Sequence, residues 1–283
     1  MKTVNIVGVP EHFNLPWHLA IEDGLFEDAG IHLVWTDVPE GTGKMRDMLR
    51  SGETDLAIIL TGGIIKDITN GNPSSIVQTY VASPLVWGLH VGANSTFQSL
   101  QELKNATAAI SRLGSGSHLV SYLFAKNNGW DTKKLSFKII DNLPGAVDAL
   151  SKGEADYFLW EHFTTKPWVD NGTFRRLGDI PTPWPCFVIA ARNEFIEKEK
   201  AVLKIILEKI NTVTADFKFI PSIDRTLANR YEQKLEDIQE WLAITEWSQE
   251  PLDKNTINAI QKELLAVGII DEVADYSKLT TKL

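Results

Sequence analysis

The stretch 48–63, MLRSGETDLAIILTGG, returns later in the chain as 149–163, ALSKGEADYFLWEHF. The two copies share Leu-x-x-Gly-Glu-x-Asp at a constant offset of 101 residues, with the matched pairs Leu49 and Leu150, Gly52 and Gly153, Glu53 and Glu154, and Asp55 and Asp156. In each copy a helix pattern ends at a glycine, and a short turn leads into a buried strand. The chain therefore contains the same structural unit twice.

The correspondence continues upstream of both copies, in the stretches 4–31 and 107–130. VNIVGVPEHFNLPWHLAIEDGLFEDAGI and TAAISRLGSGSHLVSYLFAKNNGW each read as strand, loop, helix and a glycine stop. Strands that alternate with helices of this length predict βαβ units and parallel sheets. The alternative is a single doubly wound sheet in which the repeat has arisen by chance.

The repeat predicts an α/β protein of two similar lobes. Lobe one would comprise residues 1–83 and 190–283, and lobe two residues 92–180. The segments 84–91 and 181–189 would cross between them, the second kept extended by the prolines of IPTPWP. The chain after 194 is helical in pattern, with Val202, Ile205, Ile206, Ile210, Val213 and Phe217 on one face, and we expect these helices to cover lobe one.

Composition excludes several classes of function. The 283 residues carry a net charge of −9 with no basic block, which argues against nucleic acid as a partner. The single cysteine, Cys186, excludes an internal disulfide, and apolar runs such as Leu56–Leu60 are too short to span a membrane. The six histidines show no metal-binding spacing, so neither a metal nor a cofactor is predicted.

Residues 1–9, MKTVNIVGV, alternate like a strand and lack the apolar segment of a signal peptide. We therefore expect a cytoplasmic protein. A leader removed from the chain would leave the same pattern, and the protein would then be periplasmic or a lipoprotein.

A binding site is expected where the strands of the two lobes end, because ligands of open parallel sheets bind beyond the carboxyl ends of strands. Helix starts rich in Gly, Ser and Thr, together with aromatic, histidine and glutamate side chains, fall at these positions. The candidate ligand-binding residues are His12, Asn14, Thr42, Gly43, Thr61, Gly62, Ser83, Trp87, Ser111, Gly114, Ser115, Gly116, Ser117, His118, Trp160, Glu161, His162 and Trp184.

The sequence GSGSH, 114–118, stands between a strand and a helix. Free amides at a helix start and the positive end of the helix dipole favour an anion there, such as a carboxylate, sulfonate or phosphate. The alternative is an ordinary serine-capped helix without a ligand. The similar GTGKM, 41–45, is no phosphate-binding P-loop, because Val38 replaces its first glycine and Met45 follows its lysine.

The sequence WEHF, 160–163, places Glu161 after a largely apolar strand. A carboxylate in such a place needs a cationic or N–H partner, which an amine or amidine of a ligand would supply while a neighbouring aromatic ring stacks on it. The alternative is a glutamate that caps a helix over 162–170.

SRLGSGSH, WEHFTTKPW and IPTPWP, in this order, resemble a leaderless group of type II periplasmic-binding-protein-like proteins found in fungi and some bacteria. This superfamily includes receptors for nitrate, sulfonates and pyrimidine precursors of thiamine. The resemblance covers essentially the whole chain and implies a hinged two-lobe fold with a ligand in the cleft. The ligand of the group is unsettled.

Three functions are compatible with these observations. The first is a binding protein that closes over an anionic or zwitterionic small molecule, aminopyrimidines among the candidates, and that would partner an ABC permease if exported. The second is a cytoplasmic enzyme acting on a thiamine-pyrimidine or related precursor, with His118, His162 and Glu161 as acid–base groups. The yeast pyrimidine-precursor synthase is such an enzyme, but its cysteine-rich motif is absent here. The third is an intracellular ligand sensor.

Overall fold

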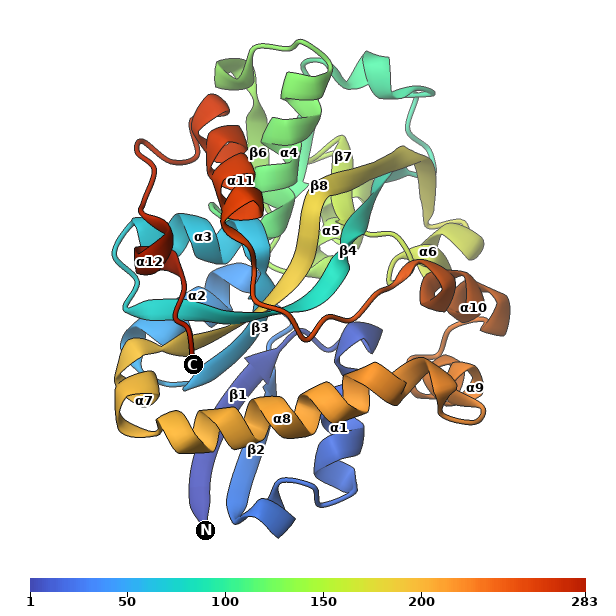
Figure 1. Ribbon diagram of the computed structural model, residues 1–283. Helices are drawn as coiled ribbons and strands as arrows, with labels where there is room; N and C mark the ends of the chain where they lie inside the picture. The colour runs from blue at the N-terminus through green and yellow to red at the C-terminus, as the bar shows by residue number, and fades with distance from the viewer.

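The computed structural model describes residues 1–283 and has one mixed sheet of eight strands flanked by helices (Figure 1). The strand order is β2-β1-β3-β8-β4-β7-β5-β6. The strands are β1 (Lys2–Gly8), β2 (Ile31–Asp37), β3 (Leu56–Leu60), β4 (Ser74–Gly92), β5 (Thr107–Ile110), β6 (Ser136–Ile139), β7 (Tyr157–Glu161) and β8 (Phe174–Arg192).

The sheet consists of two halves with the same internal order, β2-β1-β3 and β6-β5-β7. Within each half these strands are parallel, as the βαβ pattern of the sequence predicts. The first half is at the bottom of Figure 1 and the second at the top. The fold is therefore the predicted α/β arrangement, and the repeat reflects a real structural duplication.

The two halves are joined by β4 and β8, which are antiparallel to each other and run through both. The first part of β4, residues 74–81, pairs with the last part of β8, whereas residues 87–92 pair with its beginning. The register slips between these parts, where Pro84 lies opposite Pro185 and Val86 opposite Pro181. Proline donates no ladder hydrogen bond, so the pairing is weakest where the chain passes from one half to the other.

The two long strands also pair with different neighbours in the two halves. Residues 87–91 of β4 pair with β7 in the second half, and residues 187–191 of β8 pair with β3 in the first half. The irregular pairing itself lies around 81–86 and 181–187.

The repeated aspartate fixes the first strand of each half in the same way. The Oδ2 atom of Asp55 accepts a hydrogen bond from the Asn5 amide at 3.0 Å, and that of Asp156 accepts from the Thr107 amide at 2.7 Å. The amides of both aspartates donate back to the carbonyls of these residues. Gly52, which precedes Asp55 in the repeat, has a φ of +80°, a left-handed value that suits glycine at a helix end.

Twelve α-helices surround the sheet, and none is long and apolar enough to cross a membrane. They are α1 (Leu15–Glu22), α2 (Thr42–Ser51), α3 (Thr61–Thr69), α4 (Gly116–Asn127), α5 (Leu143–Ser151), α6 (Lys166–Asp170), α7 (Asn193–Lys198), α8 (Lys200–Asp216), α9 (Ile223–Arg230), α10 (Leu235–Ile244), α11 (Lys254–Ala266) and α12 (Tyr276–Leu279).

Helix α8 lies across the first half of the sheet beside α1, as expected for the C-terminal helices (Figure 1). Of the predicted face, Ile206, Ile210 and Phe217 are fully buried, and the other members are partly buried. Leu203 and Leu207, which the predicted face omits, are also buried, so the apolar stripe is wider than predicted.

The later helices also reach the second half. Lys166 of α6 lies 3.5 Å from Asp237 of α10, and Lys234 lies 2.7 Å from Asp170 of α6. Helix α11 contacts α4 through an ion pair between Glu263 and Lys126. The C-terminal helices therefore cover the first half and extend beyond it.

The equivalence of the repeats is tested by removing the second aspartate. Asp156→Ala leaves the Thr107 amide without its side-chain acceptor and should lower the free energy of unfolding by about 1–3 kcal/mol in urea denaturation. Glu154→Ala in the same repeat is the control, because Glu154 is half-exposed and pairs only with Lys138, so its loss should cost about 0.5 kcal/mol or less. Equal losses for the two variants would contradict this role of the aspartate.

Candidate functional site

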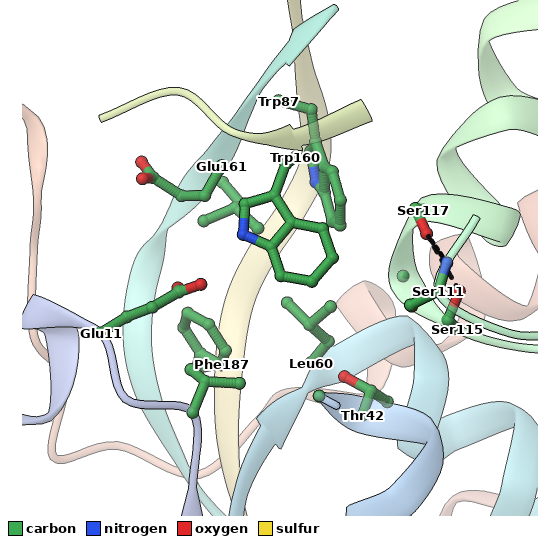
Figure 2. Close-up of a pocket in the computed structure, with 14 residues that line it drawn as sticks. Glu11, Thr42, Leu60, Trp87, Ser111, Ser115, Ser117, Trp160, Glu161 and Phe187 are labelled. Carbon is green, nitrogen blue, oxygen red and sulfur yellow. Dashed lines mark hydrogen bonds between the residues drawn. The ribbon is translucent and has the colours of Figure 1, made fainter. Parts of the chain in front are cut away.

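A cavity lies between the two halves of the sheet, close to where β4 and β8 cross (Figure 2). Its volume is about 40 Å³, which is room for a few water molecules. The lining residues from the first half are Val9, Glu11, Gly41, Thr42, Leu60 and Phe187, and the others are Leu85, Trp87, Ser111, Ser115, Gly116, Ser117, Trp160 and Glu161. Both halves therefore build the site.

One end of the cavity is lined by the hydroxyl groups at the start of α4. Ser115 caps this helix, because its Oγ atom accepts a hydrogen bond from the His118 amide at 3.3 Å. The Ser117 hydroxyl accepts from the Ser111 amide at 3.1 Å, which ties the helix start to the end of β5. Thr42, the first residue of α2, faces the same end from the first half. Two helix starts thus place positive dipole ends here.

Two cations from the first half stand beside this end. A Cβ atom added at Gly114 would lie 3.2 Å from Arg46 Nη2 and 3.4 Å from Lys66 Nζ. Arg46 is buried with its Nε atom unpartnered, and its nearest carboxylate, Asp67, is 3.8 Å away. Burial and the charge of Arg46 lower the pKa of Lys66. The field at the hydroxyl end is therefore positive.

The other end of the cavity carries Glu161, the last residue of β7, which is only 4 % exposed. Its Oε2 atom accepts a hydrogen bond from the Thr164 amide at 2.6 Å. Helix α6 begins at Lys166, so Glu161 holds a turn and does not cap the helix over 162–170 considered from the sequence. Burial raises the pKa of Glu161, against the opposing effect of the Thr164 and Phe163 backbone amides.

Glu11 joins Glu161 at this end and was not among the predicted site residues. It lies three residues after the end of β1 and is 8 % exposed (Figure 2). Burial first, and then the negative charge of Glu161, raise the pKa of Glu11 to about 8, while a hydrogen bond from Trp160 opposes the rise. In the sequence, Glu11 could have been recognised as a charged residue between the apolar end of a strand and a buried turn.

Aromatic and aliphatic side chains form the middle of the cavity. The Trp160 indole lies between the two glutamates and the serines, with Leu60 and Phe187 below it in the view of Figure 2. Trp87 lies behind it, and its buried Nε1–H has no hydrogen-bond partner. The cavity therefore has a carboxyl end, an aromatic middle and a positive end.

The predicted site residues are divided by the structure into three groups. Eight line the cavity, namely Thr42, Trp87, Ser111, Ser115, Gly116, Ser117, Trp160 and Glu161. Gly62 and Trp184 line a smaller neighbouring cavity of about 20 Å³ that shares Leu60, Trp87 and Gly116 with the first. The remaining eight line neither.

The three histidines among the candidates do not converge. His12 packs edge-on against Trp241 with ring centroids 4.2 Å apart, and burial lowers its pKa to about 3. His118 accepts a hydrogen bond from the Gly114 amide and contacts Phe137, and burial followed by the charge of Lys66 lowers its pKa to about 4.

His162 lies apart from both, with its Nδ1 atom 2.8 Å from Asp179 Oδ1 and its ring against Arg176. The structure has no group of three or more His, Cys, Asp or Glu side chains that could hold a metal ion.

The other predicted residues outside the cavities have structural partners. Asn14 donates to the Val9 carbonyl at 2.8 Å, and Thr61 donates to the Pro185 carbonyl at 2.6 Å. Ser83 accepts from the Glu246 amide at 3.1 Å. Gly43 lies under the Arg112 side chain, and Gly114 lies beside Arg46 and Lys66.

Comparisons with known proteins agree with this arrangement. Residues 87–180 match the family model described as Ca3427-like PBP. The Candida albicans CA3427 gene product, described as defining a new family with the generic periplasmic binding protein fold, is 26 % identical in sequence. Its structure superposes with a TM-score of 0.91 over 100 % of this chain and 97 % of that one.

Two more distant structures share the fold. The alkanesulfonate-binding protein SsuA from Xanthomonas axonopodis pv. citri, bound to MOPS, is 15 % identical, with a TM-score of 0.81 over 96 % of this chain and 95 % of its own. The zinc-bound ligand-binding component of an ABC-type import system from Staphylococcus aureus is 15 % identical, with a TM-score of 0.76 over 100 % of this chain and 97 % of that one. No curated protein matches the sequence significantly.

The chain is thus a periplasmic-binding-protein-like protein with the type II fold. Within that class, the chain is similar to the Ca3427-like family in both sequence and structure.

The protonation of Glu11 should make stability depend on pH. The folded protein binds a proton up to pH about 8, whereas the unfolded chain releases it near 4.5. This stabilisation is therefore complete below about 4.5 and is lost as the pH rises through about 8. Glu11→Gln keeps the side chain neutral and should raise the free energy of unfolding at about pH 9 by on the order of a few kcal/mol.

The measurement is urea denaturation of both proteins between about pH 5 and pH 9. Glu208→Gln, on the exposed face of α8, is the control and should follow the wild type. A Glu11→Gln variant whose stability falls with pH as steeply as that of the wild type would contradict the buried protonation site.

Gly116 should control how closely the two halves approach. A Cβ atom there would lie 2.5 Å from Leu60 Cδ1, across the cavity in the first half. Gly116→Val should therefore hold the halves apart and increase the radius of gyration in small-angle X-ray scattering, with a loss of stability of about 1–3 kcal/mol at most. Asn127→Val, exposed at the far end of α4, should leave the radius unchanged. An unchanged radius for Gly116→Val would show that the contact does not limit closure.

Proposed function

We propose that the protein binds an anionic or zwitterionic small molecule by closing two lobes over it. Lobe one comprises residues 1–83 and 190–283, lobe two residues 92–180, and the segments 84–91 and 181–189 act as the hinge. The observation that carries this proposal is a cavity lined by both halves, with a positive helix-start end and an end that carries the carboxyl groups of Glu11 and Glu161.

The cavity lining is divided between the two lobes, which is why a ligand would favour their closure. Thr42, Leu60 and Phe187 come from lobe one or its border, whereas Ser117 and Trp160 come from lobe two. A ligand that contacts both sets binds the closed form better than the open form and shifts the equilibrium toward it. Typical ligand pockets measure about 300–1,000 Å³, so the cavity of about 40 Å³ corresponds to lobes closed on each other.

The distribution of charge along the cavity supports an anionic or zwitterionic ligand. The amides at the start of α4, with Arg46 and Lys66 nearby, suit a carboxylate, sulfonate or phosphate. The similarity to an alkanesulfonate-binding protein supports an anionic group. The aromatic middle and Glu161 suit a flat group with N–H donors, and an aminopyrimidine has this character. The similarity to a component of an ABC-type import system supports an ABC permease as partner if the protein is exported.

The first experiment is a thermal-shift screen against sulfonates, amino acids, pyrimidine precursors and vitamin fragments, with mass analysis of each mixture. A ligand at 100 times its Kd stabilises by about 2.7 kcal/mol, which raises Tm by roughly 2–4 °C for a chain near this size. A compound recovered unchanged supports a binding protein. A compound that is chemically converted would show that the protein is an enzyme and does more than bind. If no compound of these classes changes Tm, the proposed class of ligand is wrong.

Ser115→Asp tests the anion end with little change in the fold, because aspartate caps helices as well as serine does. The added charge should weaken an anionic hit from the screen at least about tenfold, or about 1.4 kcal/mol, in calorimetric titration. Ser136→Asp, exposed in the same lobe, is the control and should leave affinity unchanged. Equal affinity of Ser115→Asp and the wild type would show that the anionic group of the ligand does not bind at this end.

A further inference from the structure

We infer that Glu11 and Glu161 together receive a positively charged amine or amidine group, with one carboxylate supplied by each lobe. This inference rests on the proposed function, and it narrows the ligand from anionic or zwitterionic to one that carries a positive nitrogen group at this end.

The first support is the position of the two carboxylates. Glu11 follows β1 of lobe one and Glu161 ends β7 of lobe two, and Figure 2 shows both on the same side of the Trp160 indole. They are 8 % and 4 % exposed. Neither forms an ion pair with a lysine, arginine or histidine. Two buried carboxylates without a counter-ion are unfavourable unless a proton or a ligand compensates them.

The second support is independent of the carboxylates. Trp87 lines the same cavity, and its Nε1–H is buried without an acceptor. A buried donor without a partner is unfavourable, so a ligand with an acceptor atom that reaches Trp87 would relieve it. The Trp160 ring beside the glutamates adds a face on which a cation or a flat cationic group is stabilised.

The charged and titratable groups around the two carboxylates include no cation that forms an ion pair with either of them, so a ligand could supply the positive charge. Glu11 faces Glu161, the buried thiol of Cys186 on β8, and Tyr231 after α9, none of which is a cation. Glu161 faces His162 and Arg176 in addition to Glu11. Arg176 is engaged by the His162 carbonyl at 2.6 Å and by the His162 ring. Arg46, which pairs with Asp67, and Lys66 stand beside Gly114 at the hydroxyl end.

Binding of a positive group should be linked to release of a proton. Burial and the charge of Glu161 raise the pKa of Glu11 to about 8, so Glu11 holds a proton at neutral pH when the site contains no cation. A cation between the two carboxyl groups favours their ionised forms, so Glu11 releases its proton when the cation binds. Affinity for a cation whose own charge is constant should consequently increase as the pH rises from about 6 to about 8.

The test compares acetamidinium with acetamide, which has nearly the same size and shape but no charge. Acetamidinium remains protonated throughout this pH range, and both molecules are small compared with typical ligands. The readout is the Trp160 indole N–H resonance in NMR titration, assigned by Trp160→Phe. We expect acetamidinium to shift this resonance saturably, with a Kd that decreases from about pH 6 to pH 8, and acetamide to have little effect.

The variants Glu11→Gln and Glu161→Gln should each weaken acetamidinium binding about tenfold or more, and Glu11→Gln should also abolish the pH dependence. Glu208→Gln is the matched control and should behave as wild type. Because Glu161 also holds the turn at Thr164 and Glu11 accepts a hydrogen bond from Trp160, the Tm of each variant is measured beside its Kd, and both are expected to stay close to the wild-type Tm. An equal response to acetamide, no response of Trp160, or wild-type binding by Glu11→Gln would each overturn the inference.

Failure here is distinguishable from failure of the proposed function. A ligand found by the screen that closes the lobes but carries no positive group would overturn the inference and leave the binding function intact. Acetamidinium binding in a protein for which no screened compound changes Tm or the radius of gyration would support the carboxylate site and count against ligand-driven closure.

Discussion

The antiparallel pairing of β4 with β8 is the constraint on which the rest of the structure depends. Both strands have 19 residues and pass through both halves of the sheet, so each half is completed by strands that begin or end in the other. The pairing is irregular where prolines lie opposite each other, and the cavity is next to that region. The weakest part of the shared ladder and the site are therefore neighbours, an arrangement that the proposed hinge would need.

Much of the fold follows from short-range features that do not need the rest of the chain. Gly52 and Asp55 read in the sequence as a helix stop and a strand start, and the structure adds that the aspartate holds the adjacent parallel strand. The serines at the start of α4 could likewise be assigned to the cavity, because a strand followed by GSGSH fixes where they must lie.

The parts that could not be predicted depend on partners far away in the sequence. His12 is at the carboxyl end of β1 as expected, but Trp241 of α10 and Tyr231 draw its ring into an aromatic cluster. Its neighbour Glu11 faces the cavity instead. A strand end specifies a place and not a side-chain direction, and the raised pKa of Glu11 arises from burial and from Glu161 on another strand. No local pattern contains that information.

The ion pairs between the C-terminal helices and the second half have a consequence for the energy of opening. Lys234 with Asp170 and Lys126 with Glu263 join the two parts of the molecule outside the cavity, with side chains that are 25–56 % exposed. Such pairs are screened by dissolved ions over distances of about 8–10 Å at physiological salt. In the proposed closing mechanism, these pairs, which lie away from the cavity lining, couple the balance between open and closed molecules to ionic strength, so the salt concentration of the surroundings sets a baseline on which a ligand acts.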